Sequence, residues 1–157
     1  MKLVNTLFYR AARLYWQVTG PLTVGVRVCA VKNDAVLLVK PTYQKYWCFP
    51  GGGVKRLETL MDAARRETRE EAGAILGDPL VLMGVYTAFG EGKSDHVALF
   101  LSRDFTMNGR RFPSLEIERC AFFPLDRAIS DKAVSPATRR RLREYLAWDG
   151  TVKVGGW

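Results

Sequence analysis

The chain has 157 residues, of which 48% are hydrophobic and 25% are charged, and these values fit one folded domain and argue against a disordered chain. No apolar run approaches the roughly 20 residues that a membrane-spanning helix needs, and the three scattered cysteines lack the spacing of a zinc site or a disulfide framework, which favours reduced thiols in a cytoplasmic protein. The net charge of +8 indicates attraction to phosphates, nucleic acid or anionic membranes without choosing among them.

Residues 1–18 predict an amphipathic helix, and we treat residues 1–20 as a helical unit ahead of a domain formed by residues 21–157. One interpretation is that this helix packs on the domain or on a second copy in a homodimer. The other is that it lies on an anionic membrane surface, because its charges are all basic. We favour packing. In this predicted helix, the apolar residues at helical spacing are Leu3, Leu7, Ala11, Leu14 and Val18, and the charged residues are Lys2, Arg10 and Arg13.

The next segments read as strands. Residues Leu22 to Val31 are rich in β-branched side chains, and Lys32-Asn33-Asp34 predicts a turn into a returning strand over Ala35 to Val39. Lys45 to Phe49 predicts a short aromatic strand that leads into the glycine loop Pro50–Gly53. Glycine has no side chain, so the backbone of this loop can approach a ligand closely.

A helix is predicted from Thr59 to Ala72, with Gly73 as its C-terminal stop. Glu67, Glu70 and Glu71 lie at i, i+3 and i+4, a spacing that places all three carboxylates on one helix face. Clustered like charges are costly unless a cation binds there. Carboxylate oxygens favour Mg²⁺ or Mn²⁺ over softer metals. The residues therefore predict a divalent-metal site beside the glycine loop.

The remaining elements complete an α+β domain with a mixed sheet flanked by helices. Ser135 and Pro136 have the residue types of an N-cap and first helical position. The expected segments are strands over Leu80–Phe89 and Val97–Ser102 around a loop Gly90–His96, a polar connection Phe105–Leu115, a strand Cys120–Pro124, a helix from Pro136 to about Ala147, and an edge strand over Thr151–Val154.

The stretch from Gly52 to Ala74 resembles the Nudix box. The matching positions are Gly52, Glu58, Arg66-Glu67, Glu70-Glu71 and Gly73, with the spacing of that motif. The resemblance covers about Leu22 to Ala147 and implies an α/β/α sandwich. It also implies Mg²⁺- or Mn²⁺-dependent hydrolysis of the pyrophosphate bond in a nucleoside diphosphate linked to another moiety, X, by attack of water at phosphorus.

The resemblance assigns roles at the site. It implies that Glu67, Glu70, Glu71 and the carbonyl oxygen of Gly51 bind the metal, while Arg66 and Glu58 orient the carboxylates and steady the loop. Hydrolysis also needs a base that deprotonates water. Our choice is Glu70, with Glu116 as the alternative because it precedes a late strand and corner that resemble those of the family. Glu91 and Asp95 are weaker rivals.

Residues outside the box are expected to recognise the substrate. Tyr43, Tyr46 and Trp47 are candidates for stacking on a nucleobase, and the alternative is that at least one of Tyr46 and Trp47 is a core residue. Lys40 and Lys55 are candidates for binding a polyphosphate, with simple solvation as the alternative.

Four arginines on the last predicted helix keep other functions open. Arg139, Arg140, Arg141 and Arg143 are candidates for contact with an RNA backbone, although part of the set must be solvated. The alternatives to a nucleotide hydrolase are therefore a non-catalytic nucleotide- or RNA-binding module and an RNA 5′-end pyrophosphohydrolase. The basic amphipathic helix of residues 1–18 adds a weaker alternative, a lipid diphosphate hydrolase.

Overall fold

The computed structural model describes residues 22–90, 93–109 and 112–157. The helix predicted at residues 1–18 lies outside these ranges. Among the helices of the described residues, none combines the length and the apolar character needed to cross a membrane.

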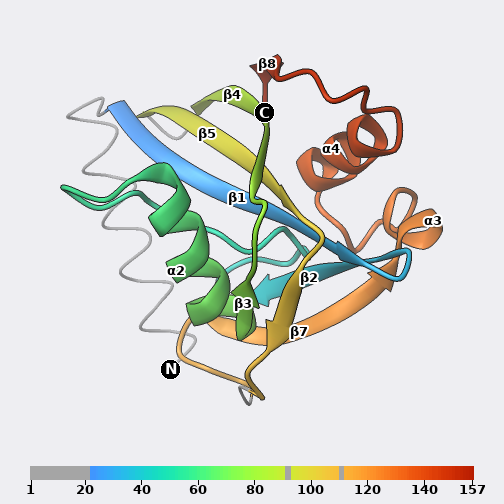
Figure 1. Ribbon diagram of the computed structural model, residues 1–157. Helices are drawn as coiled ribbons and strands as arrows, with labels where there is room; N and C mark the ends of the chain where they lie inside the picture. The colour runs from blue at the N-terminus through green and yellow to red at the C-terminus, as the bar shows by residue number, and fades with distance from the viewer. Residues whose placement is uncertain (1–21, 91–92, 110–111) are drawn as a thin grey trace.

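A six-stranded mixed sheet forms the centre of the domain, in the strand order β7-β2-β1-β5-β4-β8 (Figure 1). The β1–β5 and β4–β8 pairs are parallel, and the other pairs are antiparallel. The strands are β1 (Leu22–Lys32), β2 (Ala35–Pro41), β4 (Val81–Gly90), β5 (Lys93–Ser102), β7 (Ile117–Pro124) and β8 (Lys153–Gly156).

Helices cover the two faces of this sheet, which confirms the expected α/β/α sandwich (Figure 1). Side chains alternate between the faces along β1. Val26 and Val28 belong to the core cluster that includes Ala63 of α2 (Leu60–Ala72). Cys29 belongs to the cluster on the other face, which includes Leu142 of α4 (Pro136–Leu146).

The glycine loop runs beside β1. The N–H groups of Val26 and Val28 donate to the carbonyl oxygens of Gly52 and Pro50 at 2.9 and 3.0 Å. The chain then enters α2, whose N-cap Thr59 accepts a hydrogen bond from the N–H of Asp62, as expected of a threonine in that position. These contacts fix the loop between the sheet and the helix.

The structure corrects several predicted segments. Residues 93–96 are strand rather than loop, because β4 and β5 form a longer hairpin than their apolar patterns indicate. Lys45–Phe49 does not form a strand, since only Trp47 and Cys48 make isolated bridges and Pro50 has no N–H to continue a ladder. The connection over residues 105–115 contains β6 (Phe105–Met107), which pairs with β3 (Ala74–Leu76), and the short helix α3 (Leu125–Ala128) follows β7.

Candidate active site

The glycine loop packs too closely for side chains at two of its positions. At Gly51, φ is +141°, and a Cβ atom would lie 2.1 Å from the carbonyl oxygen of Val26. At Gly52, a Cβ atom would lie 2.7 Å from the carboxylate of Glu67. Glycine therefore lets the loop touch the backbone of β1 at one position and the acidic face of α2 at the next.

Arg66 binds three acidic side chains and the loop. Its Nε and Nη2 atoms donate to the two carboxylate oxygens of Glu58 at 2.6 and 2.8 Å, and its Nη1 donates to Glu67 Oε1 at 2.6 Å. The same Nη1 lies 3.4 Å from Glu70, and Nη2 donates to the carbonyl oxygen of Gly53 at 3.1 Å. The paired bonds to Glu58 hold the guanidinium plane in one orientation. Arg66 thus links the candidate ligands to the loop.

The Glu58–Arg66 pair gives a prediction for stability against pH. The hydrogen bonds from Arg66, followed by the bond from the backbone N–H of Lys55, lower the pKa of Glu58 to about 2. Because this pKa lies below the value of about 4.3 in an unfolded chain, the stabilisation is complete above that value and disappears as the pH falls through 2. We expect Glu58→Gln to lower the melting temperature near neutral pH.

Thermal unfolding of both proteins across the acid range measures this effect. The difference in melting temperature between wild type and Glu58→Gln should shrink as the pH falls, since the wild-type carboxylate also becomes neutral. A difference that stays constant down to the acid limit would show that the charge of Glu58 does not stabilise the fold.

Glu71 is the buried member of the acidic face. Its Oε2 accepts a hydrogen bond from the N–H of Gly51 at 2.8 Å, and the residue is 7% exposed. Burial raises the pKa of Glu71 to about 7, although Arg27 and the bond from Gly51 act in the opposite direction. The charges of Glu67 and Glu116 add to the rise, so Glu116 lies near enough to Glu71 to interact with it. The protein groups around Glu71 therefore compensate the charge of this buried carboxylate incompletely.

Arg27 is a site residue that the sequence predictions missed. Its Nη1 donates to the carbonyl oxygens of Phe49, at 3.3 Å, and of Gly51. The sequence feature that could have identified Arg27 is its charge, because it is the single charged residue in the apolar, β-branched segment from Leu22 to Val31. Arg27 therefore holds the carbonyl group of a candidate ligand and supplies a positive charge beside the glycine loop.

The oxygen atoms of this site fit a hard divalent cation. Glu67, Glu70 and Glu71 share one helix face, and the first and last of them contact consecutive residues of the glycine loop. In the described ranges, no three acidic, histidine or cysteine side chains already form a metal-ligand group. The carboxylate of Glu70 is half exposed. The fit therefore rests on the donor chemistry and on the buried charge of Glu71.

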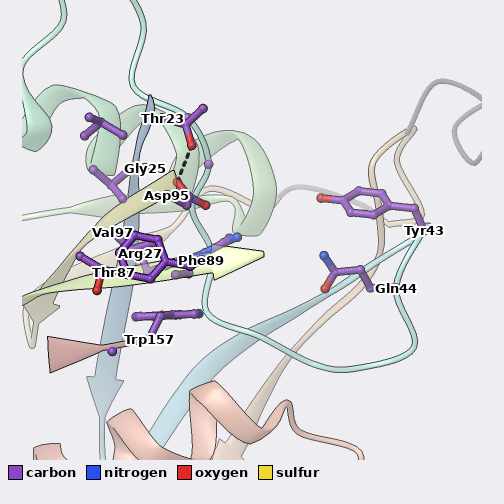
Figure 2. Close-up of a pocket in the computed structure, with 16 residues that line it drawn as sticks. Thr23, Gly25, Arg27, Tyr43, Gln44, Thr87, Phe89, Asp95, Val97 and Trp157 are labelled. Atoms are coloured by element: carbon purple, nitrogen blue, oxygen red, sulfur yellow. Dashed lines mark hydrogen bonds between the residues drawn. The ribbon is translucent and has the colours of Figure 1, made fainter. Parts of the chain in front are cut away.

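A pocket of about 730 Å³ opens beside the glycine loop, on the sheet face that α4 covers only in part (Figure 2). Its volume lies within the range of small-molecule sites. Gly52 and Gly53 line one side of the pocket. Residues on alternate positions of three neighbouring strands contribute much of the rest, namely Thr23, Gly25 and Arg27 of β1, Asp95 and Val97 of β5, and Thr87 and Phe89 of β4, together with Trp157.

Some predicted substrate residues lie elsewhere. Trp47 packs against Phe123 with the ring centroids 4.9 Å apart, so the structure favours the core interpretation for this residue. Tyr46, Lys40 and Lys55 do not line the pocket, whereas the aromatic candidate Tyr43 does, together with Gln44. Glu91 lies outside the described residues, and Asp95 accepts a hydrogen bond from Thr23 at 2.9 Å in the pocket wall.

The arginines of α4 make intramolecular contacts. Arg141 is 5% exposed, so the prediction that it contacts RNA is wrong. Its guanidinium lies 4.0 Å from the ring centroid of Tyr86. Arg140 and Arg143 are exposed but donate to the carbonyl oxygens of Trp157 and Ile129, each at 2.5 Å. Sequence spacing alone could not show these contacts, because their acceptors are backbone atoms of other segments.

Comparisons with known proteins show which family and which solved structures the chain resembles. Residues 21–148 match the family model described as the NUDIX domain. The chain is similar to a MutT NUDIX hydrolase from Burkholderia pseudomallei (26% identity, TM-score 0.69, 78% of this chain and 97% of the other covered). It is also similar to a NUDIX hydrolase from Nitrosomonas europaea (24% identity, TM-score 0.71, 81% of this chain and 90% of the other covered). In fold it is similar to a structure described as ADP compounds hydrolase (19% identity, TM-score 0.65, 81% of this chain and 74% of the other covered). None of the curated proteins matches it in sequence.

The family match covers most of the chain and includes the whole acidic helix and its glycine loop. The fold, the box residues and the family model therefore agree, and the chain belongs to the Nudix hydrolase family.

Proposed function

We propose that the chain catalyses the Mg²⁺- or Mn²⁺-dependent hydrolysis of the pyrophosphate bond in a nucleoside diphosphate linked to another moiety. The observation that carries the proposal is the arrangement around Arg66, which holds the acidic face of α2 against the glycine loop. This acidic face borders a pocket of nucleotide size, because Gly52 touches Glu67 on one side and lines the pocket on the other. The family consists of hydrolases of such substrates, so the chemistry and the fold point to the same class.

Four groups are proposed to hold the cation: the carbonyl oxygen of Gly51 and the carboxylates of Glu67, Glu70 and Glu71. A cation bound there supplies charge neutralisation of the diphosphate and polarisation of phosphorus. Arg66 keeps Glu67 turned towards the loop through a 2.6 Å bond. Loss of such a supporting contact commonly costs about 10- to 100-fold in metal affinity or activity.

Glu70 is proposed as the base that accepts a proton from the attacking water. It is the exposed member of the acidic face, so water reaches its carboxylate without displacing protein atoms. Glu116 is the alternative, and its electrostatic influence on Glu71 supports its place near the site. Both carboxylates are within reach of solvent, as a base that activates water must be.

A hydrolysis screen tests the proposal. The substrates are ADP-ribose, nucleotide sugars, dinucleoside polyphosphates, nucleoside triphosphates, RNA with a 5′-triphosphate and an isoprenoid diphosphate, each with Mg²⁺, Mn²⁺ or EDTA. We expect release of a phosphate-containing product from at least one nucleoside diphosphate derivative with either metal, and none with EDTA. Absence of turnover on every compound, together with RNA binding that weakens steeply with salt, would favour a non-catalytic binding module.

The RNA-binding alternative receives less support from the contacts of α4. Arg141 is buried, and Arg140 and Arg143 already bind backbone carbonyl groups. An RNA 5′ end therefore stays in the screen as a substrate and is not proposed as a partner. We keep the cytoplasm as the proposed compartment because Cys29, Cys48 and Cys120 are free thiols.

A further inference from the structure

We propose that Trp157 is the residue that binds the nucleobase of the substrate, by stacking its indole ring against the flat face of the base. The inference rests on the proposed function and goes beyond it, because it assigns the chemical class of the group that enters the pocket and names the residue that selects it. It depends on three observations: how Trp157 is held, where it lies in the pocket, and what lies opposite.

Trp157 is held firmly although it follows a short, exposed strand. Strand β8 pairs in parallel with β4, and the N–H of Trp157 continues this pairing by donating to the carbonyl oxygen of Thr87 at 2.8 Å. Two arginines of α4 bind the same segment. Arg140 Nη2 donates to the carbonyl oxygen of Trp157 at 2.5 Å, and Arg141 Nη1 donates to that of Gly156 at 2.9 Å.

A buried network fixes Arg141 in turn. Its guanidinium lies over the ring of Tyr86 and pairs with Glu144 at 2.7 Å, while the Tyr86 hydroxyl donates to the same carboxylate at 2.8 Å. Tyr86 also meets Trp157 edge-on, with the ring centroids 5.8 Å apart and an interplanar angle of 62°. The indole ring is therefore set before any ligand binds, so little conformational entropy is lost on binding.

Different residues of the pocket lining suit the two parts of a nucleotide. Gly52 and Gly53 line the pocket, and Gly52 lies against Glu67 of the acidic face, where a diphosphate would lie. Trp157 lines the pocket together with Thr87 of β4, and both are labelled in Figure 2. Phe89 adds a second aromatic ring that is 79% exposed. A partly buried indole ring and an exposed phenyl ring in the lining of a pocket of this volume indicate a flat, aromatic ligand group.

Polar groups lie across from the aromatic side. In Figure 2, Tyr43 and Gln44 reach into the pocket from the side opposite Trp157 and Phe89. The hydrogen-bonded pair of Thr23 and Asp95 forms part of the wall. The edge of a base carries hydrogen-bond donors and acceptors that can meet such polar side chains, whereas an isoprenoid chain carries none. The pocket thus favours a base over a lipid.

Three substitutions at position 157 test the proposal. Trp157→Phe keeps an aromatic ring, Trp157→Leu keeps apolar bulk against Tyr86 without one, and Trp157→Ala removes both. For the nucleotide substrate that wild type hydrolyses best, we expect KM to rise about 10-fold or more in the Leu and Ala variants, the size of a typical base–aromatic stack, with little change in kcat. The Phe variant should stay within about threefold of wild type.

Binding measurements separate this inference from the proposed function, because they need no turnover. Titration calorimetry with AMP, GMP, CMP and UMP should show weaker binding in Trp157→Leu for each nucleotide that wild type binds, while ribose 5-phosphate binds both proteins equally. Arg140→Gln, which loosens the tail but leaves the indole ring, should weaken nucleotide binding to a smaller extent. Melting temperatures confirm that each variant is folded.

Two results would overturn the inference. Equal nucleotide binding by wild type and Trp157→Leu would show that the ring does not contact the base, and tighter binding by Trp157→Ala would show that the ring blocks the pocket. If wild type hydrolyses no diphosphate in the screen, the proposed function fails, while selective loss of AMP binding in Trp157→Leu would still support the base site.

Discussion

Replacing Glu70 by glutamine is expected to lower kcat by about 10²–10⁴-fold, the range for loss of a general base. The substitution removes the negative charge of the exposed carboxylate on the acidic face of α2 and retains its size. Within the part of the chain that the structure describes, the Glu70 carboxylate makes only a long 3.4 Å contact, with Arg66, so the fold should tolerate the change. Steady-state hydrolysis at saturating Mg²⁺, with the melting temperature measured in parallel, checks both expectations.

Two further variants serve as the control for Glu70→Gln and as the test of the alternative base. Asp126→Asn, at an exposed position on α3, is the control for loss of a surface carboxylate and should keep wild-type kcat. Glu116→Gln tests the alternative base. If Glu116→Gln lowers kcat strongly and Glu70→Gln does so only weakly, the two roles proposed here are reversed.

The three adjacent glycines of the loop are expected to respond differently to alanine. A Cβ atom at Gly52 would meet the flexible end of Glu67, so Gly52→Ala should fold normally but displace that carboxylate. A displacement on the order of 1 Å costs about 10²-fold in rate. At Gly51 the Cβ atom would meet the backbone of Val26, and φ is +141°, so Gly51→Ala should lower stability as well as activity.

Gly53→Ala is the matched control for folding, because among the described residues no atom beyond the adjacent ones lies within 4 Å of a Cβ atom built at Gly53. It should keep the melting temperature close to wild type and lose less activity than Gly52→Ala, because its methyl group displaces no carboxylate. Activities and unfolding curves for the three variants give the comparison. Full activity in Gly52→Ala would show that the position of Glu67 beside the loop is not needed for catalysis.

The acidic site could be predicted from sequence because its parts are local. Glu67, Glu70 and Glu71 lie within five consecutive residues, and helix geometry alone places them on one face. Thr59 and Gly73 mark the ends of that helix by capping chemistry that depends only on nearby backbone. The family resemblance then supplied the roles of these residues and the architecture around them.

The pocket could not be predicted in the same way, because its residues come together through strand pairing. Thr23 of β1 lies beside Asp95 of β5 across a parallel pair, and Trp157 joins them only because β8 pairs with β4. The local amino-acid composition predicts neither of these strand pairings. The sequence predicted an edge strand in the segment before Trp157, where β8 lies, but it predicted no function for that strand.

Other side chains seemed from their place in the sequence to contact a ligand, but they pack against distant parts of the protein. Trp47 stands next to the glycine loop in sequence, which suggested contact with a base, yet its ring packs on Phe123 and its backbone pairs with the residues that precede α4. The α4 arginines looked like a nucleic-acid surface, yet Arg141 is buried against Tyr86. In both cases the tertiary partner, distant in sequence, determines the role of the side chain.

Hydrolysis in water labelled with heavy oxygen tests the central proposal most directly. With Mg²⁺ and the best substrate of the screen, we expect mass spectrometry to find the label in a phosphate group of one of the two products, because water attacks phosphorus. Label in a hydroxyl group of the moiety X, with both phosphate groups unlabelled, would show cleavage of a carbon–oxygen bond and would contradict the proposed reaction.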